Sequence, residues 1–354
     1  MRSYARILLC CLFTALLPAL HLSAAGGLEV HFIDVGQGDS ILIRAVEEDI
    51  AILVDAGDAA AGQTVISYLK RAGVTRITHL VATHPHADHI GGMPAVIREF
   101  PIDRVFMPRA THTTRTYENL LLAIRAKGLR ITEAKAGVTV VDMPGLNASF
   151  VGPVGSGYDE LNNYSAVLMV RYRDTRFLFT GDAEAHSEGE MVRSGVSLQA
   201  DVLKVGHHGS RTSTTAAFLD AVGPGIAVIP CGRGNSYGHP HAGTLARLER
   251  AGVQVFRTDL QGHIVITSDG ERVAVTTARA AAPPAAGIMP DASGEGGTAM
   301  PDAGQSYVGN RRSKVFHSPG CASVADMNAG NAIKLNSRES AVAQGYRPCG
   351  RCRP

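Results

Sequence analysis

The stretch Thr83-His84-Pro85-His86-Ala87-Asp88-His89 places three histidines and an aspartate within six residues, directly after the apolar residues 77–82. The apolar residues predict a buried strand that ends where the polar ones begin. His84 and His86 point the same way from an extended turn and can share one metal ion. Asp88 and His89 then enter a helix and can face a second ion. So dense a cluster predicts a metal site rather than a set of structural histidines.

Two further polar clusters sit at the ends of apolar strands. Thr180-Gly181-Asp182 ends one, and Lys204-Val205-Gly206-His207-His208-Gly209-Ser210 ends another. Because α/β proteins place active sites at the carboxyl ends of strands, we expect the three clusters to meet. Together they supply ligands for two divalent ions, with Asp182 placed to bridge: His84, His86, Asp88, His89, Asp182, His207 and His208. Which of His207 and His208 binds metal stays open, although the Val-Gly-His context favours His207.

Composition divides the 354 residues into four parts. Residues 1–25 combine Arg2 and Arg6, an apolar run and small residues at its end, which predicts a signal peptide; a membrane anchor is the alternative. Residues 26–278 form the body. Residues 279–305 are rich in Ala, Gly and Pro and predict a flexible linker, and residues 306–354 form a small module. We therefore expect an exported protein, periplasmic or secreted, without stable membrane insertion after cleavage.

Strand-like and helical patterns alternate along the body, which predicts an α/β fold with layered sheets and helices outside. The expected strands are 28–35, 40–44, 50–54, 77–82, 166–172, 177–180, 201–205, 226–229, 255–257, 263–268 and 272–277. The expected helices are 65–72, 90–99, 117–127, 184–193, 215–221 and 243–250.

Charge is unevenly distributed. The formal net charge is +2, which Arg2 and Arg6 account for, so the chain without its signal is near neutral. From residue 306 onward, eight basic residues stand against Asp326 and Glu339, which makes the tail about +6 and the rest of the chain after the signal, residues 26–305, about −6. This asymmetry indicates an anionic partner for the tail, or a solvated basic surface. No protein partner can be inferred.

The order of these motifs resembles the metallo-β-lactamase fold, with Asp55-Ala56-Gly57 between the first strands and the histidine cluster. The stretches 32–40, Asn162-Asn163-Tyr164-Ser165, 204–210 and Asn235-Ser236-Tyr237-Gly238-His239-Pro240 are similar to the hydrolase domain of ComEC, the competence DNA-uptake channel. The resemblance spans residues 28–277. It implies a four-layer αββα fold with the metals in a cleft between the sheets, and nuclease action on one DNA strand.

One departure from the fold's usual pattern concerns the first metal. Most members supply a further histidine between the His-x-His cluster and the Thr-Gly-Asp turn, where this chain has only His112, outside a strand end. Asn163, or its neighbours Asn162 and Ser165, is expected to take that place. Because amide and hydroxyl oxygens are harder ligands than imidazole, the preference shifts from Zn²⁺ toward Mn²⁺ or Mg²⁺. The expected cofactors are two divalent ions, Mn²⁺ or Zn²⁺.

The predicted chemistry is hydrolysis of a phosphodiester by a hydroxide that two metal ions activate. Asp88 and Asp182 would act at the metals, and Asp55 would orient the cluster from behind. His239 and Lys204, with His241 and Arg233 nearby, are candidates to hold the substrate phosphate or protonate the leaving oxygen. The alternative is that residues 237–240 form a turn without a role in catalysis.

The tail carries His317 and Cys321, then Cys349 and Cys352, a set suited to one structural tetrahedral Zn²⁺; disulfide pairing is the alternative. With Ser337-Arg338-Glu339-Ser340-Ala341 and Gly345-Tyr346-Arg347-Pro348-Cys349, it resembles the zinc module of Ada, the DNA alkylation-repair protein. His317 stands where that family has its methyl-accepting cysteine, so we expect a structural, DNA-contacting module without methyl transfer.

The leading hypothesis is therefore an exported DNA nuclease. The alternatives are a cell-surface phosphodiesterase acting on a non-nucleic phosphoester such as phosphorylcholine, and a DNA-binding protein without catalysis. A lactam or lactone hydrolase agrees with the fold but less well with the motifs at 162–165 and 237–240.

Overall fold

The computed structural model divides the chain into two compact units, Met1–Pro283 and Pro284–Pro354. It describes residues 27–280 and, in the last part of the chain, residues 307–311, 313–318, 321, 324, 329–335, 341 and 344–349. The expected signal peptide (1–25) and nearly all of the expected linker (279–305) lie outside the described residues.

The first sheet of the large unit has eight strands in the order β15-β14-β1-β2-β3-β4-β5-β6. Neighbours from β15 to β3 run antiparallel, and those from β3 to β6 run parallel. The strands are β1 (Leu28–Phe32), β2 (Ile41–Ala45), β3 (Ile50–Val54), β4 (Ile77–Val81), β5 (Ile102–Met107), β6 (Ile131–Glu133), β14 (Ile264–Ser268) and β15 (Val273–Thr277).

The second sheet repeats this plan with seven strands in the order β13-β12-β11-β10-β9-β8-β7. Neighbours from β13 to β10 run parallel and the rest antiparallel. The strands are β7 (Thr139–Met143), β8 (Leu146–Gly152), β9 (Val167–Tyr172), β10 (Thr175–Phe179), β11 (Val202–Lys204), β12 (Ile226–Ile229) and β13 (Gln254–Arg257).

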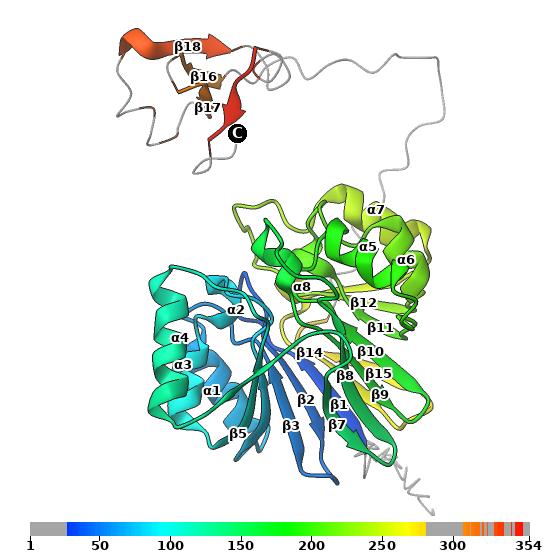
Figure 1. The fold of residues 1–354 in the computed structure, drawn as a ribbon. Helices are drawn as coiled ribbons and strands as arrows, with labels where there is room; N and C mark the ends of the chain where they lie inside the picture. The colour runs from blue at the N-terminus through cyan, green and yellow to red at the C-terminus, as the bar shows by residue number, and fades with distance from the viewer. Residues whose placement is uncertain are drawn as a thin grey trace, which may run out of the picture. The chain divides into compact units, whose positions relative to one another are not determined.

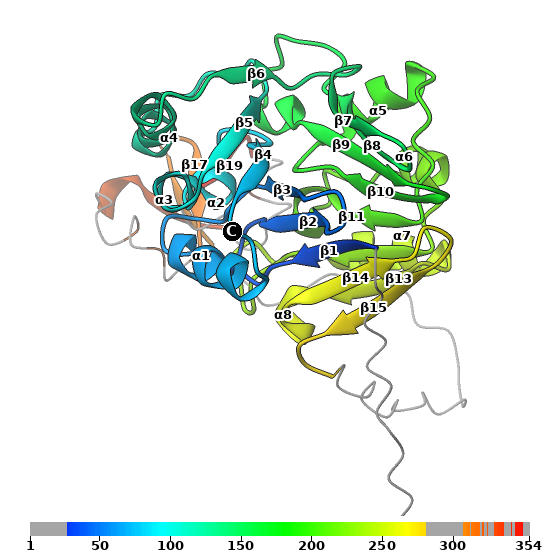
Figure 2. The same cartoon turned by 90° about the horizontal axis from the view of Figure 1, so that it is seen from below.

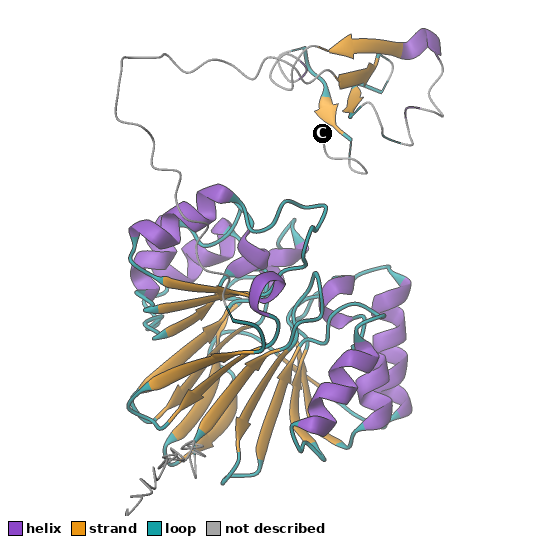
Figure 3. Ribbon diagram, turned by 180° about the vertical axis from the view of Figure 1, so that it is seen from behind, coloured by secondary structure: helices purple, strands orange, loops and turns teal. Residues whose placement is uncertain are grey.

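The two sheets pack face to face between outer helices (Figures 1 and 3). Phe32 meets Phe179 at 6.1 Å between ring centroids, and Phe106 meets Phe150 at 5.7 Å, each pair joining one sheet to the other. Helices α1 (Gly62–Arg71), α3 (Met93–Glu99) and α4 (Arg115–Ala126) cover the first sheet. Helices α5 (Ala185–Arg193), α6 (Ala216–Val222) and α7 (Ala242–Arg250) cover the second. The expected αββα layers are thus present.

One expected helix, at 90–99, is broken in two. Helix α2 (Ala87–Ile90) ends before Gly91 and Gly92, and α3 starts at Met93. A Cβ at Gly92 would lie 2.1 Å from the carbonyl oxygen of Ala56. The glycine pair therefore lets the loop after β3 approach closely, at the expense of one continuous helix.

Short helices complete the loops of the large unit: η1 (Leu161–Tyr164), η2 (Gly206–Gly209) and α8 (Thr258–Gln261). In the described parts of the chain, we find no helix both long and apolar enough to span a bilayer.

The small unit has a four-stranded sheet in the order β18-β16-β17-β19. The elements are β16 (Tyr307–Asn310), β17 (Val315–His317), η3 (Ala329–Asn331), β18 (Ala332–Leu335) and β19 (Arg347–Pro348). Its core contains Tyr307, Phe316, Leu335, Ala341 and Tyr346. A segment of this length buries little apolar surface when it folds, so a bound metal ion would add to its stability.

Replacing Gly38 with alanine tests the approach of the β1–β2 turn to the histidine cluster. A Cβ there would lie 2.3 Å from the Asp88 carbonyl oxygen, on a backbone with φ of 142°. We expect the free energy of unfolding, measured by denaturant titration, to fall by about 2–3 kcal/mol.

Gly36→Ala is the matched control, since Gly36 has φ of 76° and no atom within 4 Å of its added Cβ. Backbone strain alone should cost it about 1 kcal/mol. Equal losses in the two variants would contradict the close approach.

Candidate metal centre

Loops at one end of both sheets build the site. His84, His86, Asp88 and His89 follow β4, Asp55 follows β3, Asp182 follows β10, and His207 and His208 follow β11. Asp39 joins them from the turn between β1 and β2. The three clusters expected to meet therefore do so, because parallel strands end at the same edge of a sheet.

The carboxylate of Asp182 is the centre of the cluster. Its Oδ2 lies 3.2 Å from Nε2 of His89, 3.5 Å from Nε2 of His208, 3.7 Å from Nε2 of His207 and 3.9 Å from Nε2 of His84. Its backbone N–H donates to Ser165 Oγ at 3.0 Å, which fixes the turn. Asp182 therefore stands where it can bridge two groups of imidazoles.

The first group consists of His84 and His86. Nε2 of His84 lies 3.0 Å from Nδ1 of His86, and His84, His89 and Asp182 form one set of closely spaced ligand atoms. Burial, followed by the charge of His89, lowers the pKa of His84 well below its usual value. His84 is therefore neutral at pH 7, the form that binds metals.

The second group consists of Asp88, His89 and His208. Asp88 Oδ2 lies 3.8 Å from Nε2 of His89 and 3.3 Å from Nε2 of His208. Both of these Nε2 atoms are buried and have no hydrogen-bond partner among the described residues. Carboxylate oxygens lie near both nitrogens but form no well-directed hydrogen bond with them, and a metal ion between these groups would satisfy both.

A carboxylate lies behind each histidine of this second group. Asp55 Oδ2 lies 2.8 Å from Nδ1 of His89, and Asp55 also accepts from N and Oγ1 of Thr83, at 2.9 and 2.6 Å. Asp39 Oδ1 lies 3.3 Å from Nδ1 of His208, which is also 3.0 Å from the Pro230 carbonyl oxygen. Such backing fixes the tautomer that directs Nε2 at a metal ion.

Asp39 was not among the residues that the sequence predicted at the site. Asp39 is 1% exposed, and its Oδ2 lies 2.5 Å from Nζ of Lys204. A charged residue directly after a Gly-Gln-Gly turn was the available signal, but the sequence does not show that this turn meets residue 204.

Lys204 itself differs from its expected role. Its side chain is 0% exposed, so it cannot reach a substrate phosphate. Nζ donates to the Gly181 carbonyl oxygen at 2.6 Å and lies 3.6 Å from Asp182 Oδ1. Burial opposes the charge of Lys204, but Asp39 and Asp182 raise its pKa above the usual value. Lys204 is thus a buried counter-ion that positions both carboxylates.

His207 and His208 also differ from the expectation that favoured His207. His208 is 1% exposed and belongs to the set formed with Asp88 and His89. The His207 side chain is 24% exposed, and its Nδ1 lies 3.1 Å from Glu184 Oε1. Both residues have positive φ, 50° and 53°, so the chain turns sharply and sends the two rings in different directions.

Ser165, one of the three residues expected to replace a further histidine, lies beside His84. Its Oγ lies 3.4 Å from Nδ1 of His84. Asn163 is used elsewhere, since its Oδ1 accepts from the backbone N–H of Ser187 at 3.1 Å, at the start of α5. Asn162 Nδ2 donates to Glu184 at 3.0 Å. Of the three residues expected there, Ser165 lies against the cluster.

The loop at 235–241 lies on the other side of the cluster. The His239 ring is 5.4 Å from that of His207, and its Nδ1 is buried without a hydrogen-bond partner among the described residues. Burial, with the charges of His208 and His207, lowers its pKa to about 3. Nδ1 of His241 accepts from Arg211 N at 3.2 Å, and Arg233 donates to the Asp259 carbonyl oxygen. Of these, His239 alone faces the site.

Electrostatics favour bound cations at the centre. Burial lowers the pKa of His89, but the carboxylates of Asp182, Asp88 and Asp55 outweigh burial and raise this pKa well above its usual value. Asp182 and Asp39 likewise raise the pKa of His208 to about 10. The carboxylates therefore stabilise positive charge at this centre. Without metal, protons on His89 and His208 supply that charge. Divalent ions can supply it instead, because carboxylates and imidazoles are suitable ligands for them.

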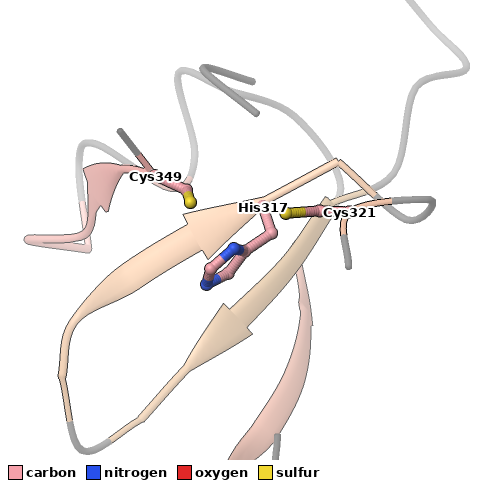
Figure 4. A group of neighbouring side chains, drawn as sticks. All are labelled: His317, Cys321 and Cys349. Carbon is pink, nitrogen blue, oxygen red and sulfur yellow. The ribbon is translucent and has the colours of Figure 1, made fainter. Parts of the chain in front are cut away.

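The small unit holds a second ligand set. Ligand atoms of His317, Cys321 and Cys349 lie within 4.8 Å of one another, and Figure 4 shows the three side chains converging. Nδ1 of His317 is buried without a hydrogen-bond partner among the described residues. One imidazole and two thiols match a structural Zn²⁺ site. Cys352, the expected fourth ligand, lies outside the described residues.

Comparisons with known proteins match both units of the chain. The metallo-beta-lactamase superfamily matches residues 33–233, and the metal binding domain of Ada matches residues 301–354. The chain is 32% identical over 252 residues to ComE operon protein 3 of Bacillus subtilis, across 67% of this chain and 32% of that protein. It is 30% identical over 256 residues to Recombination protein 2 of Haemophilus influenzae, across 71% and 30%. The chain thus spans about a third of the length of these curated relatives.

A solved structure also resembles the chain: CmlA, a diiron beta-hydroxylase from Streptomyces venezuelae, aligns with a TM-score of 0.46 at 15% identity, over 69% of this chain and 54% of that one. The family match covers more than half of the sequence, and the layered sheets and clustered ligands accompany it. The chain belongs to the metallo-β-lactamase superfamily, and its C-terminal segment is a zinc-binding module like that of Ada.

Proposed function

We propose that the chain is an exported, metal-dependent phosphodiesterase and that DNA is its substrate. Members of the superfamily are metal-dependent hydrolases. The observation that carries the proposal is the convergence of imidazole Nε2 atoms on Asp182 Oδ2, two of them buried without hydrogen-bond partners among the described residues.

Two divalent ions would share Asp182. His84 and His86 would hold one, and Asp88, His89 and His208 the other. When bound, the ions would lower the pKa of a water molecule and neutralise charge on the phosphoryl group. The Ser165 hydroxyl beside His84 is a harder donor than imidazole, which favours Mn²⁺ at the first position.

The half-exposed histidines supply the remaining chemistry. Glu184 holds Nδ1 of His207, so that Nε2 faces the centre and is placed to give a proton to the leaving oxygen. With a pKa of about 3, His239 is neutral at pH 7 and a poor proton donor. It suits a hydrogen bond to a phosphoryl oxygen instead.

Several features favour DNA over other phosphoesters. The relatives bear names that refer to competence and recombination. The Ada-like module is basic, and Lys314 Nζ lies 4.6 Å from the Tyr346 ring centroid within it. A basic module can hold a phosphate backbone while the centre cleaves it. Residues 1–25 support export to the periplasm or the medium.

Substituting the central ligands tests the catalytic proposal. We expect Asp182→Ala and His86→Ala each to abolish Mn²⁺-dependent hydrolysis of bis-p-nitrophenyl phosphate. Asp39→Asn should lower it by about 10- to 100-fold, because it orients His208 without binding metal. Asp220→Ala, an exposed position on α6, is the control and should match the unsubstituted protein. Full activity in both ligand variants would refute a metal centre here.

Metal binding should release protons. Because His89 and His208 have raised pKa values, both are charged in the metal-free protein at pH 7 and must lose a proton to bind. Titration calorimetry with Mn²⁺ in buffers of different ionisation enthalpy should show about two protons released, and affinity should rise between about pH 6 and pH 9. His208→Gln should release about one proton fewer. A buffer-independent enthalpy would contradict these charge states.

The basic module should make DNA binding depend on salt. With the inactive Asp182→Ala chain, affinity for duplex DNA should fall on the order of a hundredfold between 50 and 200 mM salt. A chain ending at residue 280 should lose most of this affinity and its salt dependence. Binding by the full chain that does not weaken with salt would contradict an electrostatic role for the module.

A further inference from the structure

A recess lies where the chain crosses from the first sheet to the second. It has a volume of about 590 Å³. Its walls include Arg109 after β5, Glu133 and Lys135 at the end of β6, Pro153 after β8, and Tyr164 in η1. Figure 2 shows β6 and β7 (Thr139–Met143), between which the chain makes this crossing. Ala134 and Lys135 of the crossing line the recess.

The recess adjoins the His84–His86 side of the metal centre. Tyr164 precedes Ser165, whose Oγ lies 3.4 Å from Nδ1 of His84. Another lining residue, Thr111, precedes His112, whose ring lies 6.0 Å from that of His86 and whose Nδ1 is 3.2 Å from the Pro85 carbonyl oxygen. Both of these lining segments therefore continue to the histidines of one metal position.

The lining combines cations with an aromatic ring. Arg109 is exposed and has no carboxylate within ion-pair distance among the described residues. Lys135 lies 3.3 Å from Glu133, with both side chains exposed, a pair that contributes little and that a phosphate can replace. Tyr164 is half-buried, and its ring meets that of Tyr158 edge-on at 5.0 Å, which holds its orientation.

We propose that this recess binds the nucleotide next to the scissile phosphate of a single-stranded polynucleotide. Arg109 and Lys135 bind its backbone phosphate, and its base stacks on Tyr164. This inference rests on the proposed function and identifies its substrate as a polymer. A small phosphodiester has no second phosphate to reach Arg109.

The position of the Tyr164 ring favours a single-stranded substrate over a duplex. A base can stack on a half-buried ring inside a recess only if it has left its neighbours and its pairing partner. A duplex keeps its bases paired and presents only its backbone to such a wall. Arg109 and Lys135 are cations on a body with a net charge of about −4, so they attract a strand to one place and not to the whole surface.

Steady-state kinetics of Arg109→Ala and Tyr164→Leu test the recess. With Mn²⁺ and a single-stranded oligodeoxynucleotide, each should raise KM about 5- to 20-fold, the range expected for loss of one phosphate contact or one stacked base. The kinetics on bis-p-nitrophenyl phosphate should not change, because this ester reaches only the metals. Arg250→Ala, an exposed arginine at the end of α7, is the matched control and should leave both substrates unaffected.

The outcomes separate this inference from the proposed function. If the unsubstituted protein cleaves neither substrate, the proposed function fails. If it cleaves both and Arg109→Ala keeps its KM for the oligonucleotide, the recess is not a nucleotide site. An equal rise of KM on single-stranded and duplex DNA would overturn the single-strand assignment. Arg109 is exposed in a loop, so its variant remains informative if Tyr164→Leu does not fold.

Discussion

The large unit depends on keeping several carboxylates charged inside the protein. Asp39, Asp55 and Asp182 are each at most 2% exposed, in one small volume. Burying them is unfavourable unless positive charge accompanies them. Lys204 supplies one charge permanently, and the histidines supply more either as imidazolium or through metal ions. The strand ends of both sheets, the glycine-rich turn at 36–38 and the broken helix at 91–92 all bring these groups within reach of each other.

Much of this centre could be predicted from the sequence, because its ligands follow buried strands. A polar run after an apolar strand such as β4 or β10 marks a strand end, and parallel strands bring their ends together. Asp39 was not predictable in this way. It follows an antiparallel strand, and its partner Lys204 lies in the other sheet. The choice between His207 and His208 depends on two positive φ values, which side-chain spacing does not reveal.

The parts of the fold that the sequence did not predict are weakly patterned. Strands β7 and β8 carry exposed or half-buried Asp142, Asn147 and Ser149 among apolar residues, and neither was expected. Strand β5 begins with two exposed charged positions after its first residue. These segments are strands because they pair with neighbouring strands of the folded sheet, and not because their residues have a high intrinsic β-propensity. The recess beside β6 and β8 could not be predicted from the sequence either, because loops that are distant in sequence form its walls.

The buried ammonium of Lys204 also bears on the order in which the two units fold and bind metal. A counter-ion carried by the chain itself is present as soon as the two sheets close, so assembly of the catalytic unit need not wait for metal. In the small unit, the described part of the core is slight, so its ligand set contributes more to folding. We therefore expect the two units to differ: the large unit folds first and binds metal later, whereas the small unit folds as it binds metal.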